Sequence, residues 1–260
     1  MRQRDGSRAD VVRILAIHAH PDDVEFLAGG TLALLAGAGH ELTITTFTPG
    51  DCGSRDLGPE EIAAVRRREA AAAAGRIGAR YCCLEFPDMG IFQDDAARRR
   101  VTEALRLVRP EVVLAPSPVD YHCDHEAASA LVRDACFTAP IPNYRTSSPP
   151  IPAIPHLYWM DPVEGRDREG GLVRPDFVVD VTGAFERKRA MLAEHASQRD
   201  WLRQHHGMDE YLLEMERRTR ERGALAGVSY GEGFRQYPGH AYPQSPMLQT
   251  LLSGHIASGA

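Results

Sequence analysis

The order of the apolar segments constrains the fold of this chain more than any other feature. Four short apolar runs stand in the first half, at residues 11–17, 41–47, 80–86 and 111–116. Longer segments with the composition of helices separate them, at residues 31–38, 59–77 and 96–108. Strands that alternate with helices in this way predict an α/β fold with right-handed crossovers.

The alternation predicts a Rossmann-like, doubly wound and mostly parallel sheet with helices on both faces. The common strand order of such a sheet is 3-2-1-4-5, in which the direction of the chain reverses between strands 1 and 4. Ligands bind in the crevice at the carboxyl ends of these two strands. We therefore expect the loops that follow residues 17 and 115 to face each other.

The second half of the chain is less regular. Residues 137–155 are rich in proline and serine, which predicts a long surface connection near the site. We expect strands over residues 156–160 and 176–181, and then a helical region over residues 184–222 with a solvated, charged face. The organisation predicted is a polar N-terminal tail over residues 1–10 and a single domain over residues 11–260.

Composition and charge exclude several functional classes. The chain is 43% hydrophobic and 25% charged, as in ordinary globular proteins. Its formal net charge of -6 gives no general attraction to nucleic acid or to an anionic membrane, and we expect neither as a partner. The five cysteines include no C-x-x-C pair, which argues against a disulfide framework and a thiolate zinc site and favours the cytoplasm.

Side chains of the metal-ligand type crowd the two loops that are expected to meet. The first loop reads His-Ala-His-Pro-Asp-Asp over residues 18–23, and the second reads Asp-Tyr-His-Cys-Asp-His over residues 120–125. A catalytic zinc site commonly has three His or carboxylate ligands and one open position for water. His20, Asp23 and His125 would supply this set, whereas His18 is expected to be a core residue or a support behind the ligands.

The remaining polar residues of the two loops suggest catalytic roles. Asp22 is free to accept a proton from a metal-bound water and to return it to the leaving amine. His122, as an imidazolium held by Asp124, is the candidate that stabilises the tetrahedral oxyanion. Each loop alone also fits a simpler role, a polar turn or a helix start capped by Asp120 or Asp124. Their expected convergence favours the metal site.

The same residues resemble the PIG-L/LmbE-like zinc-dependent deacetylases of N-acetylglucosamine derivatives. The Ala-His-Pro-Asp-Asp element stands at residues 19–23, and residues 122–125 are similar to the His-Pro-Asp-His element, with Cys123 in place of proline. Residues 66–78, 86–90, 188–198 and 227–235 are similar to four further segments of the family. The resemblance implies zinc on His20, Asp23 and His125, with Asp22 as the base.

The resemblance also bears on the substrate. It implies that Arg66 contacts the substrate and that His195 lies near the pocket, although a solvated arginine and structural roles for His195 and Glu232 stay open. Met89 stands where relatives often carry arginine, which disfavours a strongly anionic substrate. A homo-oligomer is implied as well, with a hexamer as one candidate.

We therefore expect a zinc-dependent amidohydrolase that removes an N-acyl group, in the first place acetyl, from an amino sugar or an N-acetylglucosamine conjugate. One Zn²⁺ per chain is the expected cofactor, with Fe²⁺ or another divalent ion as the alternative. Two other functions stay open. His20, Asp22 and His125 also match the two-His-one-carboxylate set of non-haem Fe(II) oxygenases, which usually have a β-sandwich core. The second alternative function is that of a non-catalytic protein that binds a metal or a sugar.

Overall fold

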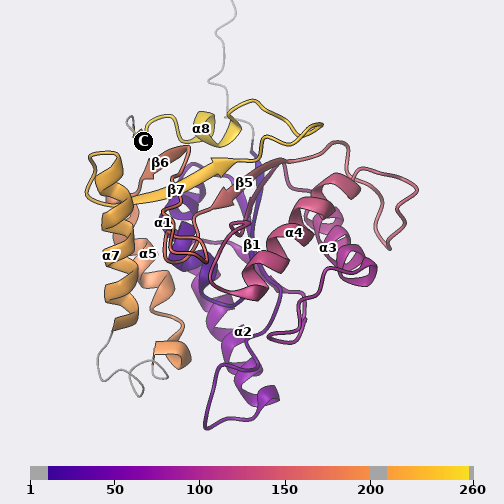
Figure 1. The fold of residues 1–260 in the computed structure, drawn as a ribbon, viewed down its shortest axis with the longest axis horizontal. Helices are drawn as coiled ribbons and strands as arrows, with labels where there is room; N and C mark the ends of the chain where they lie inside the picture. The colour runs from indigo at the N-terminus through magenta and orange to yellow at the C-terminus, as the bar shows by residue number, and fades with distance from the viewer. Residues whose placement is uncertain (1–10, 200–209, 258–260) are drawn as a thin grey trace, which may run out of the picture.

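The computed structural model describes residues 11–199 and 210–257, and within them one eight-stranded sheet runs through the centre (Figure 1). The strand order is β3-β2-β1-β4-β5-β7-β6-β8. The first five strands in this order are parallel, which confirms the predicted order 3-2-1-4-5, and the last three pair antiparallel. The strands are β1 (Arg13–His18), β2 (Glu41–Thr46), β3 (Arg80–Cys83), β4 (Val112–Ala115), β5 (His156–Met160), β6 (Phe177–Asp180), β7 (Gly231–Gln236) and β8 (Ile256–Ala257).

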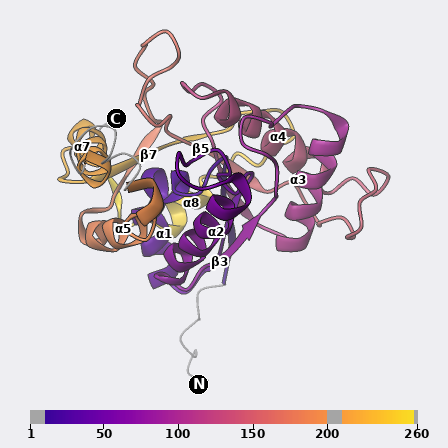
Figure 2. The same ribbon diagram turned by 90° about the horizontal axis from the view of Figure 1, so that it is seen from below.

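Helices cover both faces of the sheet, as predicted (Figures 1 and 2). Alternate residues of β1 enter different cores, because successive side chains of a strand point to opposite faces. Ile14 belongs to the core under α1, and Leu15 belongs to the core under α3 and α4. The helices are α1 (Asp23–Gly37), α2 (Pro59–Gly75), α3 (Asp95–Val108), α4 (Cys123–Thr138), α5 (Phe185–Leu192), α7 (Glu210–Leu225) and α8 (Met247–Leu251).

The first helix is longer than the sequence predicted. It begins at Asp23 rather than at residue 31, directly after the first polar loop. Gly29 and Gly30 made this stretch look unlike a helix. Their small size is instead needed for close packing, since a Cβ on Gly30 would lie 2.6 Å from the Cβ of Val181.

The helical region expected over residues 184–222 is not continuous. It consists of a 3₁₀ turn (Thr182–Ala184), then α5, a short helical stretch at residues 196–199 and α7. Residues 200–209 of the expected region lie outside the described residues. The break after α5 lets the chain turn back toward the end of β1, where it places His195 behind the first polar loop.

Two strands were not expected, β7 and the two-residue β8. The glycine-rich segment Gly231–Gln236 forms β7 and inserts between β5 and β6, antiparallel to both. Glycine in a strand often marks a close approach of a neighbour. Here the Asp161 carboxylate packs against Gly233 so closely that a side chain there would collide with it.

The proline-rich connection over residues 137–155 lies against α3. The Arg106 side chain donates hydrogen bonds to the carbonyl oxygens of Ala139 and Ile141, and Glu103 accepts two hydrogen bonds from Ser148. No residue of this connection lines the cavity at the polar loops, so its expected place near the site was wrong.

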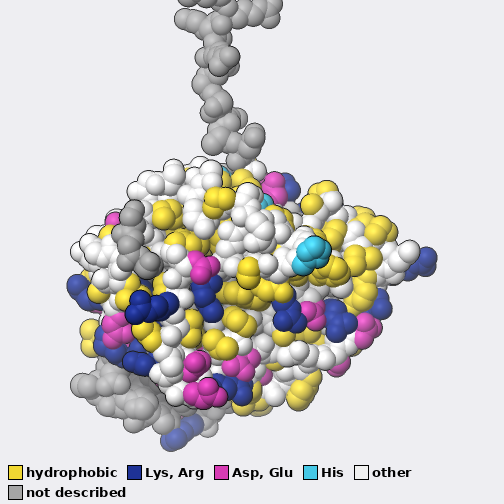
Figure 3. All heavy atoms as spheres, turned by 45° about the horizontal axis from the view of Figure 1, so that its top comes forward, with side chains coloured by type: hydrophobic (Ala, Val, Ile, Leu, Met, Phe, Trp, Pro, Cys, Tyr) yellow, Lys and Arg dark blue, Asp and Glu magenta, His cyan; other side chains and the backbone are white. Residues whose placement is uncertain are grey.

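No helix among the described residues combines the length and the apolar character that crossing a bilayer requires. On the face shown in Figure 3, Lys and Arg side chains alternate with Asp and Glu, and no broad area of one sign stands out.

The packing of α1 generates a prediction about stability. Gly30→Ala should lower the free energy of unfolding by about 1–3 kcal/mol, because the new methyl group overlaps Val181. The control is Gly37→Ala in the same helix, where the nearest atom to a new Cβ is the Arg187 guanidinium at 3.8 Å. Urea unfolding would measure both variants. Equal midpoints for the two would contradict the packing account.

Candidate functional site

The loops after β1 and β4 meet, and three of their ligand atoms form a nearly equilateral triangle. His20 Nδ1 lies 3.2 Å from His125 Nε2, and both nitrogens lie 3.4 Å from Asp23 Oδ2. Ligands that surround a tetrahedral zinc at about 2.0–2.1 Å lie about 3.3–3.4 Å from one another. The spacing of the three atoms therefore fits one ion of this size.

Two overlapping groups also bring ligand atoms within 4.8 Å of one another, one with His122 beside His20 and His125, the other with His18 beside Asp23 and His125. In the trio His20, Asp23 and His125, all three distances between ligand atoms are 3.2–3.4 Å. His18 is fully buried, and its Nδ1 lies 2.6 Å from Asp23 Oδ2. It thus supports the carboxylate from behind, one of the two roles expected for it.

The electrostatics of the site favour a cation. Burial alone would lower the pKa of His20, but hydrogen bonds to Asp124 and Asp23 outweigh it and raise the pKa to about 10. An imidazole that holds its proton so far above neutral pH lies in a field that attracts positive charge. Two imidazoles and one carboxylate are also a common donor set of catalytic zinc.

A second layer of carboxylates orients the two imidazoles. Asp120 is fully buried, and its Oδ1 lies 3.2 Å from His125 Nδ1, the ring nitrogen that faces away from the triangle. Asp124 Oδ2 lies 3.3 Å from His20 Nε2 and accepts a hydrogen bond from the Met89 backbone. Such outer carboxylates fix the tautomer and the orientation of a metal-binding histidine.

The expected pairing of Asp124 with a charged His122 does not match this geometry. His122 is the N-cap residue of α4, and its Nδ1 accepts a hydrogen bond from the Asp124 backbone N–H. The proton of the neutral ring therefore sits on Nε2. Burial, together with the neighbouring His20 and His125, lowers the pKa of His122. The ring is thus a neutral hydrogen-bond donor. The Asp124 carboxylate contacts His20 and not His122.

Asp22 is held by residues from distant parts of the chain. Its backbone lies in the left-handed region (φ 100°), which turns the chain into α1 and directs the side chain to the cavity. The Tyr211 hydroxyl donates a 2.5 Å hydrogen bond to Oδ2, and the Arg66 guanidinium lies 3.7 Å from Oδ1. Burial raises the pKa of Asp22, although the positive charge of Arg66 opposes the shift.

Tyr211 was missed because the α7 region reads as a charged, solvated surface. The signal that would have found it is the spacing of Tyr211 and Met215, four residues apart on one helix face. Both side chains are buried and pack together against α5.

The two expected substrate contacts differ in their placement. Arg66 lines the cavity, but its guanidinium already donates to the Pro21 carbonyl and faces Asp22. His195 is only 1% exposed, lies 3.7 Å from a Glu25 carboxylate oxygen and is not part of the cavity wall. Its position behind Asp22 favours support of that carboxylate over contact with a substrate.

The site opens into a cavity of about 470 Å³. Asp88, from the Phe-Pro-Asp-Met-Gly segment at residues 86–90, contributes a carboxylate whose Oδ1 is buried and has no hydrogen-bond partner among the described residues. The cavity is lined by His20, Asp22, Asp23, Phe26, Cys52, Gly53, Arg66, Asp88, Met89, Tyr121, His122, His125, Val163, Gln198, Tyr211 and Glu214.

Comparisons with known proteins identify the family of this chain. Residues 15–136 match the PIG-L family, described as GlcNAc-PI de-N-acetylase. A 1D-myo-inositol 2-acetamido-2-deoxy-alpha-D-glucopyranoside deacetylase from Nakamurella multipartita is 31% identical over 239 residues, which cover 73% of this chain and 81% of that protein. The chain belongs to the PIG-L family. The predicted resemblance is thereby confirmed.

Two solved structures of PIG-L-like fold are similar over most of their length. An N,N'-diacetylchitobiose deacetylase from Pyrococcus horikoshii superposes with a TM-score of 0.76 at 26% identity, covering 92% of this chain and 89% of that one. A 4-carboxy-2-hydroxymuconate hydratase from Pseudomonas putida gives a TM-score of 0.71 at 25% identity, covering 89% and 99%. The fold thus occurs with two different reactions.

The outer carboxylates lead to a prediction about metal affinity. Asp120→Asn should weaken zinc binding by about 10–100-fold, because His125 loses the anion that orients its ring. Competition with a chromophoric chelator would measure the dissociation constant. Asp134→Asn, at the solvated side of α4, is the matched control. An unchanged constant for Asp120→Asn would show that His125 needs no such support.

Proposed function

We propose that this protein is a zinc-dependent hydrolase that removes the acetyl group from the nitrogen of an N-acetylglucosamine-type amino sugar. The observation that carries the proposal is the triangle of His20, Asp23 and His125 ligand atoms, with Asp22 beside it in an open cavity. Membership of the PIG-L family and the deacetylases among its relatives support the reaction type.

His20, Asp23 and His125 would hold the metal, with Asp124 and Asp120 fixing the two rings. Zinc in such a site supplies a Lewis acid, which makes a water molecule acidic and polarises an amide carbonyl. The donor set and the spacing of its atoms support zinc over a cation that prefers oxygen ligands alone.

Asp22 is proposed as the general base and then the general acid. Its carboxylate accepts a proton from the attacking water as the new C–O bond forms. It returns that proton to the amide nitrogen as the C–N bond breaks, so that acetate and the free amine leave. A carboxyl group with a raised pKa suits this exchange, because it holds the proton between the two steps. Tyr211 and Arg66 each fix one of its oxygens.

His122 is proposed to stabilise the oxyanion. Its Nε2 carries the proton of the neutral ring, since Nδ1 is engaged by the Asp124 backbone. The ring lies in the cavity wall 4.8 Å, between centroids, from His20. A donor held by a helix cap in this way needs little reorganisation when charge develops on the carbonyl oxygen.

The cavity supports a sugar as the substrate. Its volume of about 470 Å³ lies within the range of small-molecule sites. The unpartnered Oδ1 of Asp88 is available to accept a hydrogen bond from a sugar hydroxyl. Location in the cytoplasm and a homo-oligomeric state stay predictions from the sequence.

A hydratase is the second candidate, because one structural relative carries that activity. The substrate of that relative, 4-carboxy-2-hydroxymuconate, carries several carboxylates. The cavity described above has one arginine, Arg66, which is already engaged by Asp22 and the Pro21 carbonyl. Apart from the histidines, its other charged lining residues are acidic, so the balance of charge favours an uncharged sugar. The oxygenase alternative finds no support in the α/β fold.

The decisive experiment is elemental analysis coupled to an assay of acetate release from N-acetylglucosamine and its glycosides, with and without a chelator. About one zinc per chain, with release that stops on chelation and returns with zinc, is the expected result. Turnover of 4-carboxy-2-hydroxymuconate without acetate release would favour the hydratase. Bound zinc without turnover of either substrate would favour a binding protein.

The assignment of the base gives a direct prediction. Asp22→Asn should keep the zinc and lower kcat by about 10²–10⁴-fold, because the ligands remain while the proton acceptor is lost. Metal content and acetate release would be measured on the same preparation. Asp56→Asn, an exposed residue, is the control. A variant of Asp22 with near-normal kcat would remove this residue from the mechanism.

The Tyr211 contact predicts a change in pH dependence. The hydroxyl donates to the ionised form of Asp22 and so lowers its pKa, against the larger raising effect of burial. Tyr211→Phe should therefore raise that pKa, and activity should disappear at a higher pH as the solution is acidified. The acid limb of the pH profile of kcat/KM measures this shift in pKa. Tyr144→Phe, at the protein surface, should leave the limb in place.

A further inference from the structure

A second compartment adjoins the catalytic cavity. It has a volume of about 570 Å³ and shares Met89, Tyr121 and His122 with the catalytic cavity. The two spaces therefore adjoin along these three side chains. Met89 and Tyr121 are 59% and 55% exposed and offer an apolar and aromatic surface between them. The other lining residues are Cys123, Glu164, Asp167, Arg168 and Gly170.

The far wall of this compartment is a hairpin formed by residues 162–173. An antiparallel bridge between Arg166 and Leu172 closes it, and the Gly165 carbonyl accepts a hydrogen bond from the Val173 backbone. At its base, the Val163 backbone N–H donates to Asp120, the carboxylate that also faces His125. Asp120 thus contacts both the hairpin and His125.

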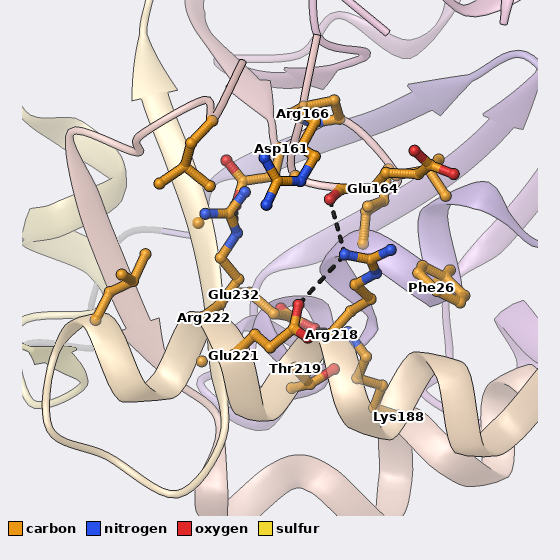
Figure 4. A pocket seen from close by; sticks show the side chains of 18 residues that line it. Phe26, Asp161, Glu164, Arg166, Lys188, Arg218, Thr219, Glu221, Arg222 and Glu232 are labelled. Atoms are coloured by element: carbon orange, nitrogen blue, oxygen red, sulfur yellow. Dashed lines mark hydrogen bonds and ion pairs between the residues drawn. The ribbon is translucent and has the colours of Figure 1, made fainter. Parts of the chain in front are cut away.

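Helix α7 holds the hairpin from the other side (Figure 4). Arg218 donates a hydrogen bond to the Glu164 carbonyl oxygen, and it also contacts Glu221 on its own helix. Arg222 pairs with the buried Asp161 at 2.6 Å, just before the hairpin begins. The charged groups on this side bind the hairpin and the segment before it. Because these contacts are made without a substrate, the compartment is formed before a substrate binds.

The charges that face the compartment are mainly negative. Arg168 is the cation in its lining, and its guanidinium is bound to Glu126 on α4 and to the Asp120 carbonyl. The other two charged residues of the lining are Glu164 and Asp167. Arg218 contacts the backbone of Glu164 and leaves its carboxylate exposed, and Asp167 uses Oδ1 to accept from the hairpin backbone.

We propose that this compartment receives the aglycone of the amino-sugar substrate and selects an aglycone that carries a positive charge over one that carries a carboxylate. The inference rests on the proposed function and specifies its substrate class. A group attached to a sugar in the catalytic cavity reaches Glu164 and Asp167 when it extends across Met89 and Tyr121. A cation gains from both carboxylates, whereas an anion is repelled by both.

The test uses three glycosides of N-acetylglucosamine that share one anomeric configuration. Their aglycones are 2-aminoethyl, 2-hydroxyethyl and carboxymethyl, and acetate release is measured because one substrate already carries an amine. We expect kcat/KM to fall in this order, with about tenfold between the first and the last at low ionic strength. The difference should shrink as salt is added, because the two carboxylates are solvated.

Two variants test whether this compartment causes the preference for a cationic aglycone. Glu164→Gln combined with Asp167→Asn should reduce the tenfold ratio to about twofold or less, with the hydroxyethyl glycoside as the neutral reference in each protein. Glu169→Gln is the matched control, because this exposed residue lies in the same hairpin outside the lining of the compartment and should keep the full ratio.

Three outcomes would overturn the proposal, and they can be distinguished. Equal kcat/KM for the three glycosides would reject the charge preference and leave the deacetylase assignment intact. A preference that survives in the double variant would reject this compartment as its source. No acetate from any glycoside, in a protein that holds zinc, would reject the proposed function together with this inference.

Discussion

The parallel pairing of β1 with β4 is the constraint on which the site depends. With Ala16 opposite Leu114, both strands end at the same edge of the sheet, and both polar loops begin there. Each loop then leads into a helix, α1 at Asp23 and α4 at Cys123. The positive ends of the two helix dipoles thus face the crevice and favour the carboxylates in their first turns. The pairing of β1 with β4 and the starts of α1 and α4 thus bring the acidic groups of the proposed cation site together.

Gathering so many acidic groups out of water has a cost, and the surrounding residues reduce it. An isolated buried carboxylate is strongly destabilising unless it is paired and hydrogen-bonded. Asp23 is matched by the His18 ring, Asp120 by the His125 ring and Asp22 by Tyr211. Removing any one partner weakens this compensation for the buried charge. The arrangement therefore works as one network, in which the position of each group is fixed by the charge of its neighbours.

The strand order and the convergence of the two polar loops could be predicted from the sequence because both follow from rules of chain direction. The supporting contacts could not. Tyr211 lies 189 positions from Asp22, and no local pattern relates the two. Asp124 was assigned to the wrong histidine, because spacing along a loop does not tell which way a carboxylate turns. β7 was hidden by its glycines, of which Gly233 leaves room for Asp161 and Gly231 for Val178 and the Gly223 backbone.

The hairpin at residues 162–173 is attached to the metal site through its backbone. Asp120 accepts from the Val163 backbone N–H, and Arg218 donates to the Glu164 carbonyl. Neither contact depends on the identity of a hairpin side chain. Glu164 and Asp167 can therefore differ without disturbing these two contacts, whereas Arg168 also donates to the Asp120 carbonyl. In the proposed mechanism, one set of metal ligands can serve substrates whose aglycones differ in charge, because the reaction and the selection depend on different atoms.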